Sequence, residues 1–207
     1  MGQDWQAGLQ VQDFTGLQGL HRPQAGARGA NCAASLQESG IWQALSAFGP
    51  AVAGTIPLGL DLPGSDIDIL LEVSDTQRFT AFCDQNFAGL DGYQRHDRAA
   101  TANVGAAVVV QFMLPAGQYP AEEVELFATN RPVMDQYGFR HMVVEARLIW
   151  LCGDAFAQQV RALKKAGLKT EPAFATLLGI PGDPYLGLDA LFGLSPSQLE
   201  HWLVGRL

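Results

Sequence analysis

The stretch DIDILLEV, from Asp66 to Val73, constrains the fold of this chain more than any other. Apolar residues dominate it, as in a buried strand, yet two aspartates stand at alternate positions. Successive side chains of a strand point to opposite faces, so Asp66 and Asp68 share one face and the isoleucines beside them face the core. Two carboxylates on one face repel each other unless a cation lies between them. The sequence therefore predicts a sheet with one buried face and a cation site on the other.

Strand patterns dominate the first 130 residues, and helical patterns follow them. Further strands are expected at 51–54, 92–97, 105–114 and 122–128, of which the last two make a hairpin. Residues 1–48 have the apolar spacing of helices, interrupted by the segment HRPQAGARGAN as a loop or a helix entry, and the chain after Pro132 has the same spacing. We therefore expect an α+β fold, with a sheet-containing domain over residues 1–130 and a helical C-terminal subdomain packed on it over residues 131–207.

Local signals mark where several helices begin. Ser74, with Gln77 three residues later, has the capping-box pattern and predicts a helix that starts there. After Pro132, the segments VMDQYGFRHMVVEARLIWL and DAFAQQVRALKKAG each predict an amphipathic helix. The final segment SPSQLEHWLVGRL repeats the capping pattern, with proline at the first helical position.

Composition narrows the class of protein. The formal net charge of −8 argues against an extended nucleic-acid surface, which needs clustered lysines and arginines. The three cysteines are far apart and form no CxxC pair, which indicates a reducing cytoplasm rather than a disulfide framework. The first residues lack the basic start and apolar core of a signal peptide, and no apolar run is long enough to span a bilayer. We expect a cytoplasmic protein with no membrane partner.

The returning strand of the hairpin supplies a third ligand for the cation. Glu123 and Glu125 alternate with apolar residues, so they also share a face. Either one can join Asp66 and Asp68; we favour Glu125, because apolar residues bury the strand directly after it, whereas Glu123 lies nearer the exposed tip. Carboxylate oxygens suit Mg²⁺ or Mn²⁺, and three of them fit two-metal phosphoryl chemistry.

The residues before the aspartates carry a resemblance to a known family. Gly54-Thr55 is followed by Gly59 and then, without a gap in the pattern, by Ser65-Asp66-Ile67-Asp68. Residues 51–128, which hold this pattern and Glu125, resemble the polymerase-beta-like nucleotidyltransferase superfamily. The longer pattern GTIPLGLDLPGSDIDIL, with RHMVVEARL and LKTEPAFATLLGIPGDPY downstream, is similar to a bacterial branch of that superfamily to which no substrate is assigned.

This resemblance implies a nucleotidyltransferase-like mixed sheet backed by helices, in which the three carboxylates hold Mg²⁺ and act as the catalytic groups. It also implies that the turn at Gly54 and Thr55, with Ser65, binds the phosphates of a nucleotide. Backbone N–H groups at a helix start can bind phosphate, and a glycine lets the phosphate approach the backbone closely.

The segment between Gly54 and Gly59 is apolar, so the cations that a triphosphate needs must come from elsewhere. Lys169, next to the start of a predicted helix, is the strongest candidate for a phosphate contact. Lys164 and Lys165 are explained more simply as the cationic last turn of the preceding helix, where they favour its dipole.

The helix after Pro132 carries a second polar group. His141 and Glu145 are four residues apart, so they share a face and can pair with each other. That face can line a cleft opposite the carboxylates, with His141 as a base or, like Arg140 and Glu123, a substrate contact. It can instead be a surface pair, or a polar knot that holds the two parts of the chain together. The sequence leaves these interpretations open.

These features favour a metal-dependent nucleotidyltransferase-like enzyme that transfers a nucleotidyl group from a nucleoside triphosphate to an unknown hydroxyl acceptor. Two alternatives stay open. The lack of cations after Gly54 suggests a non-catalytic member of the same fold that binds a nucleotide or a protein. A metal-dependent phosphoester hydrolase, with water as the acceptor, would use the same carboxylates.

Overall fold

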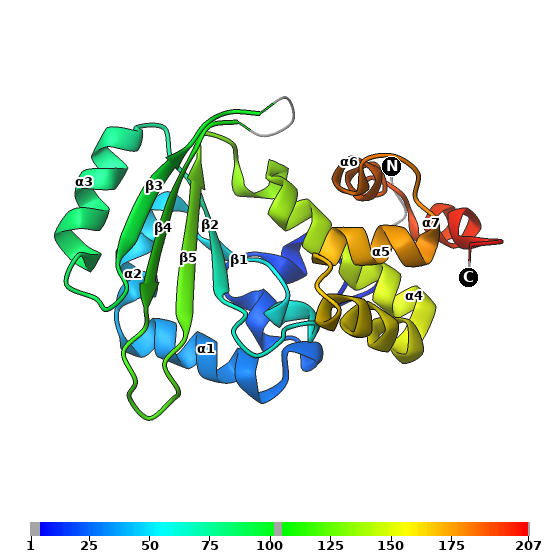
Figure 1. Ribbon diagram of the computed structural model, residues 1–207, viewed down its shortest axis with the longest axis horizontal. Helices are drawn as coiled ribbons and strands as arrows, with labels where there is room; N and C mark the ends of the chain where they lie inside the picture. The colour runs from blue at the N-terminus through cyan, green and yellow to red at the C-terminus, as the bar shows by residue number, and fades with distance from the viewer. Residues whose placement is uncertain (1–4, 102–104, 207) are drawn as a thin grey trace.

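A mixed sheet with helices on both faces forms the first part of the molecule (Figure 1). The computed structural model describes residues 5–101 and 105–206. Within them, the strands pair in the order β1-β2-β5-β4-β3. Their bounds are β1 Ala51–Val52, β2 Ile67–Glu72, β3 Gln94–Arg98, β4 Ala107–Met113 and β5 Glu123–Thr129. The β2–β5 pair is parallel and the other pairs are antiparallel, so the predicted α+β class, mixed sheet and β4–β5 hairpin are confirmed.

The two faces of the sheet bury different sets of side chains. Ile67, Ile69 and Leu71 of β2 face α1 (Gly26–Glu38) and α3 (Thr76–Phe87), together with the apolar residues of β4 and β5. Leu70, between them, packs instead into the core of the C-terminal helices. Since Asp68 alternates in the same way, its carboxyl group lies on the face that the C-terminal helices approach. The predicted alternation along β2 is confirmed.

The N-terminal segment is less helical than its apolar spacing predicted. Short 3-10 turns come first, and α1 is followed by α2 (Ile41–Leu45) and the turn η4 (Ser46–Phe48). The early turns are η1 Val11–Phe14, η2 Gln18–His21 and η3 Pro23–Ala25. Gly16 has a φ of 58° and Gly26 a φ of 57°, and both values interrupt an α-helix. The prediction for residues 1–48 is therefore correct only for the second half of the segment.

The start of α3 also differs from the prediction. Asp75 rather than Ser74 is the N-cap residue, and its Oδ1 accepts a hydrogen bond of 2.9 Å from the Arg78 backbone N–H. Asp and Ser are comparable N-cap residues, so adjacent candidates compete and the sequence alone does not choose between them. The Ser74–Gln77 capping box is therefore wrong by one residue.

The C-terminal helices agree with the predicted segments. Helix α4 (Tyr137–Lys165) is interrupted at Gly153, where φ is 80° and ψ is −178°, so its two halves match the two predicted amphipathic helices. The chain continues through α5 (Thr170–Leu178), α6 (Pro184–Asp189) and α7 (Pro196–Leu203). Ser195 and Gln198 form the predicted capping box of α7.

Two side chains join the N-terminal segment to the C-terminal part of the chain. The buried Arg147 of α4 donates hydrogen bonds to the carbonyls of Leu9 and Phe192, at 3.2 and 3.0 Å. Trp5 donates its indole N–H to the Leu194 carbonyl at 3.2 Å. The division into two domains at residue 130 remains a prediction. Among the helices described, none is long and apolar enough to cross a membrane.

Candidate metal centre and adjoining cleft

Three carboxylates from two neighbouring strands meet at one end of the sheet. In the parallel pairing of β2 with β5, Asp68 lies directly opposite Glu125. One oxygen from each of these residues and one from Asp66 lie within 4.8 Å of one another. Parallel register and the alternation along β2 together create the group. Glu123 is not part of it and is exposed at the start of β5.

The electrostatics of this group suit a bound cation. Burial, followed by the charges of Asp66 and Glu125, raises the pKa of Asp68 from 3.8 to about 8. Burial and the charge of Asp66 also raise the pKa of Glu125. Among residues 5–101 and 105–206, no lysine or arginine nitrogen lies within 4.0 Å of these carboxylates. Three half-buried oxygens without a cationic partner are the donor set of a hard divalent ion, and the residues fit such a metal.

Neighbouring residues fix the direction of these carboxylates. Gln111 of β4 lies opposite Glu125 and donates a hydrogen bond of 3.1 Å from Nε2 to its Oε2. This contact restrains the carboxylate of Glu125 beside the shared site. Gln111 was not recognised from the sequence, because its role depends on the register between β4 and β5.

Gly54 contacts the metal-binding group directly. Its φ is 74°, and a Cβ atom built on it would lie 1.8 Å from Oδ2 of Asp68. Only glycine leaves room for the carboxylate at this distance. The next residue, Thr55, starts the turn η5 (Ile56–Leu58), and its carbonyl accepts hydrogen bonds from Leu58 and Leu60. The predicted glycine turn thus lies beside Asp68, while phosphate binding by Gly54 and Thr55 remains a prediction.

Arg28 of α1 holds the loop that leads into β2. It donates two hydrogen bonds to Glu122, at 3.1 and 2.6 Å, and one of 2.8 Å to Asp61. It also donates to the carbonyl of Ser65 at 2.5 Å. The hydroxyl of Ser65 in turn accepts a 2.9 Å hydrogen bond from the Leu62 N–H, which closes the loop just before Asp66. Ser65 therefore shapes the loop through its hydroxyl, and Arg28 positions that loop.

We expect Arg28→Met to lower the free energy of unfolding by about 1–2 kcal/mol, because it leaves Glu122 and Asp61 partly buried without their cation. Arg95→Met is the matched control, since the Arg95–Asp84 pair is 42% and 45% exposed. The control should change the free energy by no more than about 0.5 kcal/mol. Urea unfolding of both variants measures the difference, and equal effects would contradict a structural role for Arg28.

A cleft of about 450 Å³ extends from the carboxylates between the sheet and the C-terminal helices. Asp68 and Glu125 line one end, and Tyr137, His141 and Tyr185 line the helical wall. Two cations missed in the sequence, Arg98 at the end of β3 and Arg131 after β5, line the other wall. Their positions depend on strand ends that meet only in the folded sheet.

His141 belongs to the cleft, but its partner differs from the one predicted. Its Nδ1 lies 3.3 Å from Oε1 of Glu171, and its Nε2 lies 2.9 Å from the Tyr185 carbonyl oxygen. A carbonyl only accepts, so Nε2 carries a proton and donates it. The predicted pair with Glu145 is therefore wrong, because α5 places Glu171 closer than the next turn of α4.

Glu145 is instead a buried carboxyl group. Its side chain is 4% exposed, and Oε1 has no hydrogen-bond partner among the described residues. Burial, with the nearby charge of Glu171, raises the pKa of Glu145 well above its usual value. This environment favours the neutral form of the Glu145 carboxyl group.

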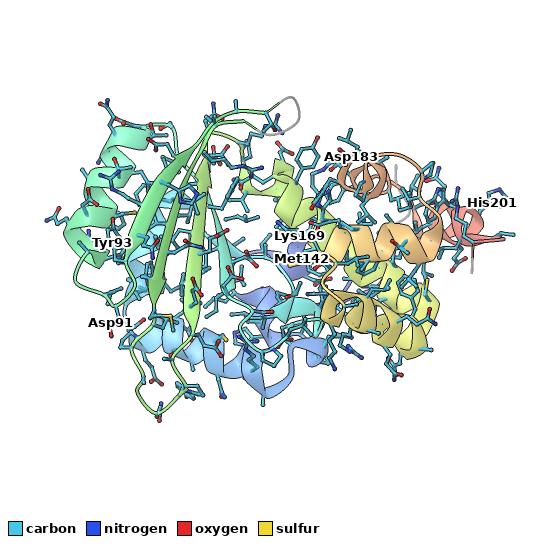
Figure 2. All side chains as sticks on the ribbon, viewed as in Figure 1. Asp91, Tyr93, Met142, Lys169, Asp183 and His201 are labelled. Atoms are coloured by element: carbon cyan, nitrogen blue, oxygen red, sulfur yellow. The ribbon has the colours of Figure 1, made fainter. Side chains whose placement is uncertain are left out.

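Lys164 lies closer to the carboxylates than its position in the last turn of a helix suggested. Lys164 is partly buried and donates a 2.8 Å hydrogen bond to the Leu60 carbonyl, and its charge acts on Asp68. Burial lowers the pKa of Lys164, against the opposing effect of nearby carboxylates. Lys169 is exposed, at the end of α5 that is nearer the sheet (Figure 2). Its role as a phosphate contact remains a prediction.

Arg140 does not line the cleft. It forms an ion pair with Asp189 of α6, with contacts of 2.5 and 3.1 Å, and its guanidinium lies 4.3 Å from the centre of the Phe192 ring. These contacts join α4 to the C-terminal helices. The Arg140 contacts stay within residues 131–207 and do not join the two parts of the chain, whereas His141 lines the cleft.

The raised pKa of Asp68 predicts how the metal-free protein responds to pH. The folded state holds this proton more tightly than the unfolded chain, whose Asp68 has the ordinary value of 3.8. The resulting stabilisation is complete below about pH 4 and is lost as the pH rises through about 8. We expect the unfolding midpoint in EDTA to fall as the pH rises from about 4 to about 8, and Asp68→Asn to reduce that fall. An identical pH dependence in the variant would contradict the assignment.

Comparison with known proteins identifies a family for this chain and several solved structures with a distantly similar fold. No protein of curated function matches the sequence. The Cid1 poly(U) polymerase with MgGTP bound is 14% identical, with a TM-score of 0.47 over 77% of this chain and 47% of that chain. A cytoplasmic RNA terminal U-transferase is 17% identical, with a TM-score of 0.45 over 83% and 46%. The chain therefore spans about half the length of these structures.

One family model matches both the sheet and most of the C-terminal helices of this chain. It matches residues 34–191, a range that includes strands β1 to β5 and helices α4 to α6. The carboxylate group, the glycine turn and the cleft all lie within it. The chain belongs to the family described as domain of unknown function DUF4269.

Proposed function

We propose that this protein is a Mg²⁺-dependent nucleotidyltransferase, which transfers a nucleotidyl group from a nucleoside triphosphate to a hydroxyl acceptor. The observation that carries the proposal is the meeting of Asp66, Asp68 and Glu125 at a cleft that Arg98 and Arg131 also line. The polymerase-beta-like pattern from Gly54 to Asp68 supports the same reaction class. Mn²⁺ can replace Mg²⁺ at such oxygen ligands.

The three carboxylates hold the metal, which when bound supplies positive charge for the phosphoryl oxygens. The acceptor hydroxyl oxygen forms a bond to the α-phosphorus, and the bond from that phosphorus to the bridging oxygen breaks. Pyrophosphate leaves with the electron pair. One of the three carboxylates is proposed to take the hydroxyl proton.

Cations around the cleft can replace those missing from the glycine turn. Arg98 and Arg131 line the wall opposite the C-terminal helices, where guanidinium groups can bind phosphate oxygens in pairs. Lys164 lies within electrostatic reach of Asp68, and Lys169 is a further candidate. Gly54 and Thr55 are proposed to contact the phosphates through their backbone, with Ser65 holding the loop.

The wall formed by α4 and α6 is proposed to contact the rest of the nucleotide. Tyr185 is 37% exposed at this wall, and its backbone is held by His141. We place His141 among the substrate contacts and leave out Arg140, which is paired with Asp189. Glu123 is exposed at the start of β5, two residues before Glu125, and is proposed to contact substrate.

Thermal unfolding with Mg²⁺ or Mn²⁺ and each ribonucleoside triphosphate tests the proposal. A ligand that binds the folded state increases the free energy of unfolding by mass action, by about 2.7 kcal/mol at a ligand concentration of a hundred times its Kd. The unfolding midpoint then rises. We expect a metal-dependent rise for at least one nucleotide in the wild type and none in Asp66→Asn/Asp68→Asn. No rise with any combination would contradict the proposal and leave a protein-binding member of the fold.

A nucleotide that binds is then incubated with metal and candidate hydroxyl acceptors. Release of pyrophosphate together with labelled acceptor is the expected result. Release of a nucleoside monophosphate and pyrophosphate without any acceptor would assign the site to hydrolysis of the triphosphate, with water as the acceptor. The reaction is proposed to take place in the cytoplasm.

A further inference from the structure

A second hollow lies on the other side of α4 from the cleft, and no residue lines both. It has a volume of about 760 Å³, within the range of small-molecule sites. We call it the elbow pocket, because it is bounded by the N-terminal turns from Gln6 to Gln24 and by α4 at its break, from Trp150 to Asp154. The positive φ of Gly153 turns the helix here, and a Cβ at that position would meet nothing within 4 Å.

Arg22, which lies in the wall of this pocket, forms no ion pair with a carboxylate of residues 5–101 or 105–206. Arg22 donates a hydrogen bond from Nη1 to the Gly8 carbonyl, and its guanidinium lies 4.2 Å from the centre of the Phe14 ring. Its Nε is buried and has no hydrogen-bond partner among the described residues. Nearby Asp13 is committed elsewhere, since its Oδ2 accepts hydrogen bonds of 2.8 Å from the N–H groups of Gly8 and Gln10.

The environment of Arg22 favours an anionic ligand. Burial lowers the pKa of Arg22, and Asp13 only partly opposes that effect. A partly buried cation without a paired anion is costly, and an anion in the pocket would offset that cost. Asp154 also lines the pocket but is exposed to solvent.

The opposite wall offers an aromatic surface. Trp150 is 48% exposed, which is unusual for so large an apolar side chain, and Ile149 and Leu58 line the same hollow. Exposed tryptophan faces bind flat apolar groups. The pocket therefore combines a flat apolar wall with a cation.

We infer that the elbow pocket is a binding site for a small organic anion that carries an aromatic ring, with Arg22 contacting the anion and Trp150 the ring. This site is separate from the cleft, and its occupancy does not depend on the proposed reaction.

The pocket also touches the segment that follows the glycine turn. Leu58 of η5 lines it, and the carbonyls of Gly59 and Leu60 accept hydrogen bonds of 2.8 Å from Arg161 and Lys164. Both cations lie on α4 beyond its break at Gly153. A ligand in the elbow pocket therefore packs directly against η5, and we expect slower amide hydrogen exchange at residues 55–60 when it binds.

The first test uses 1-anilinonaphthalene-8-sulfonate, a fluorescent aromatic anion, on the full chain in EDTA. Its uncharged counterpart, N-phenyl-1-naphthylamine, has the same rings without the sulfonate. We expect the anion to bind one site at least about tenfold more tightly than the uncharged compound, the ratio that one charge-assisted hydrogen bond supplies. Equal affinities would overturn the assignment of an anion site.

Variants locate the bound probe. Arg22→Met should remove the difference between the two compounds, whereas Arg206→Met should keep it, because Arg206 also lies over an aromatic ring, 4.3 Å from that of Trp202, but outside the pocket. Trp150→Ala, at an exposed position, keeps the test valid if Arg22→Met fails to fold. It should weaken both compounds and abolish the slower exchange at residues 55–60. Unchanged binding in Trp150→Ala, or binding that survives in Arg22→Met with its charge preference intact, would overturn the inference.

Discussion

Asp68→Asn should abolish both metal binding and nucleotidyl transfer while the fold stays intact. The amide cannot supply the charge that Asp68 offers beside Glu125, and it leaves the cluster with two carboxylates. A metal ion contributes several kcal/mol of charge stabilisation, so the loss of transfer should reach about 10³-fold or more. Isothermal titration with Mn²⁺ and a pyrophosphate-release assay measure the two effects.

Substitutions on β5 provide the matched comparison for this result. Glu125→Gln should resemble Asp68→Asn, whereas Glu123→Gln, on the same face of the same strand but outside the cluster, should bind metal normally. Circular dichroism confirms that each variant is folded. Full metal affinity in Asp68→Asn, or a larger loss in Glu123→Gln than in Glu125→Gln, would show that the carboxylate assignment is wrong.

Gly54→Ala should lower both the stability of the protein and its affinity for metal. The new Cβ would lie 1.8 Å from Oδ2 of Asp68, so either the carboxylate or the turn must move. The left-handed backbone adds about 1 kcal/mol and overpacking about 1–3 kcal/mol, so we expect a total loss of about 2–4 kcal/mol of stability. Metal affinity should fall as well, because Asp68 is displaced from the other two carboxylates. Urea unfolding and Mn²⁺ titration measure both changes.

Gly40→Ala separates the two causes. Gly40 has a φ of 75°, nearly the same as the 74° of Gly54, but a Cβ there would meet nothing within 4 Å. It should therefore lose only the backbone contribution, about 1 kcal/mol, and keep its metal affinity. If the two variants lost equal stability and both bound Mn²⁺ normally, the close approach of Gly54 to Asp68 would have no functional meaning.

Much of the sheet could be predicted because strand patterns are local. The alternation of DIDILLEV fixed which side chains of β2 share a face, and the apolar runs around it located β4 and β5 to within two residues. The same local reasoning failed where neighbouring residues compete, as at Ser74 and Asp75. It also failed in the N-terminal segment, where glycines with positive φ interrupt the apolar spacing of a helix.

Several site residues could not be found in the sequence, because contacts across elements decide them. Gln111 orients Glu125 only because β4 and β5 pair in one register. His141 meets Glu171 rather than Glu145 because α5 docks against α4. Arg98 and Arg131 reach the cleft from strand ends that are far apart in the chain.

The sequence by itself thus determined that two aspartates share a strand face and that Glu123 or Glu125 would join them. A period of two residues is a property of the backbone and needs no partner. Only the tertiary structure decided between the two glutamates, since the parallel register places Glu125 beside Asp68. The tertiary structure alone also placed Gly54 against the Asp68 carboxylate and the C-terminal helices over it. Strand register and helix docking depend on the burial of apolar residues that are far apart in the chain.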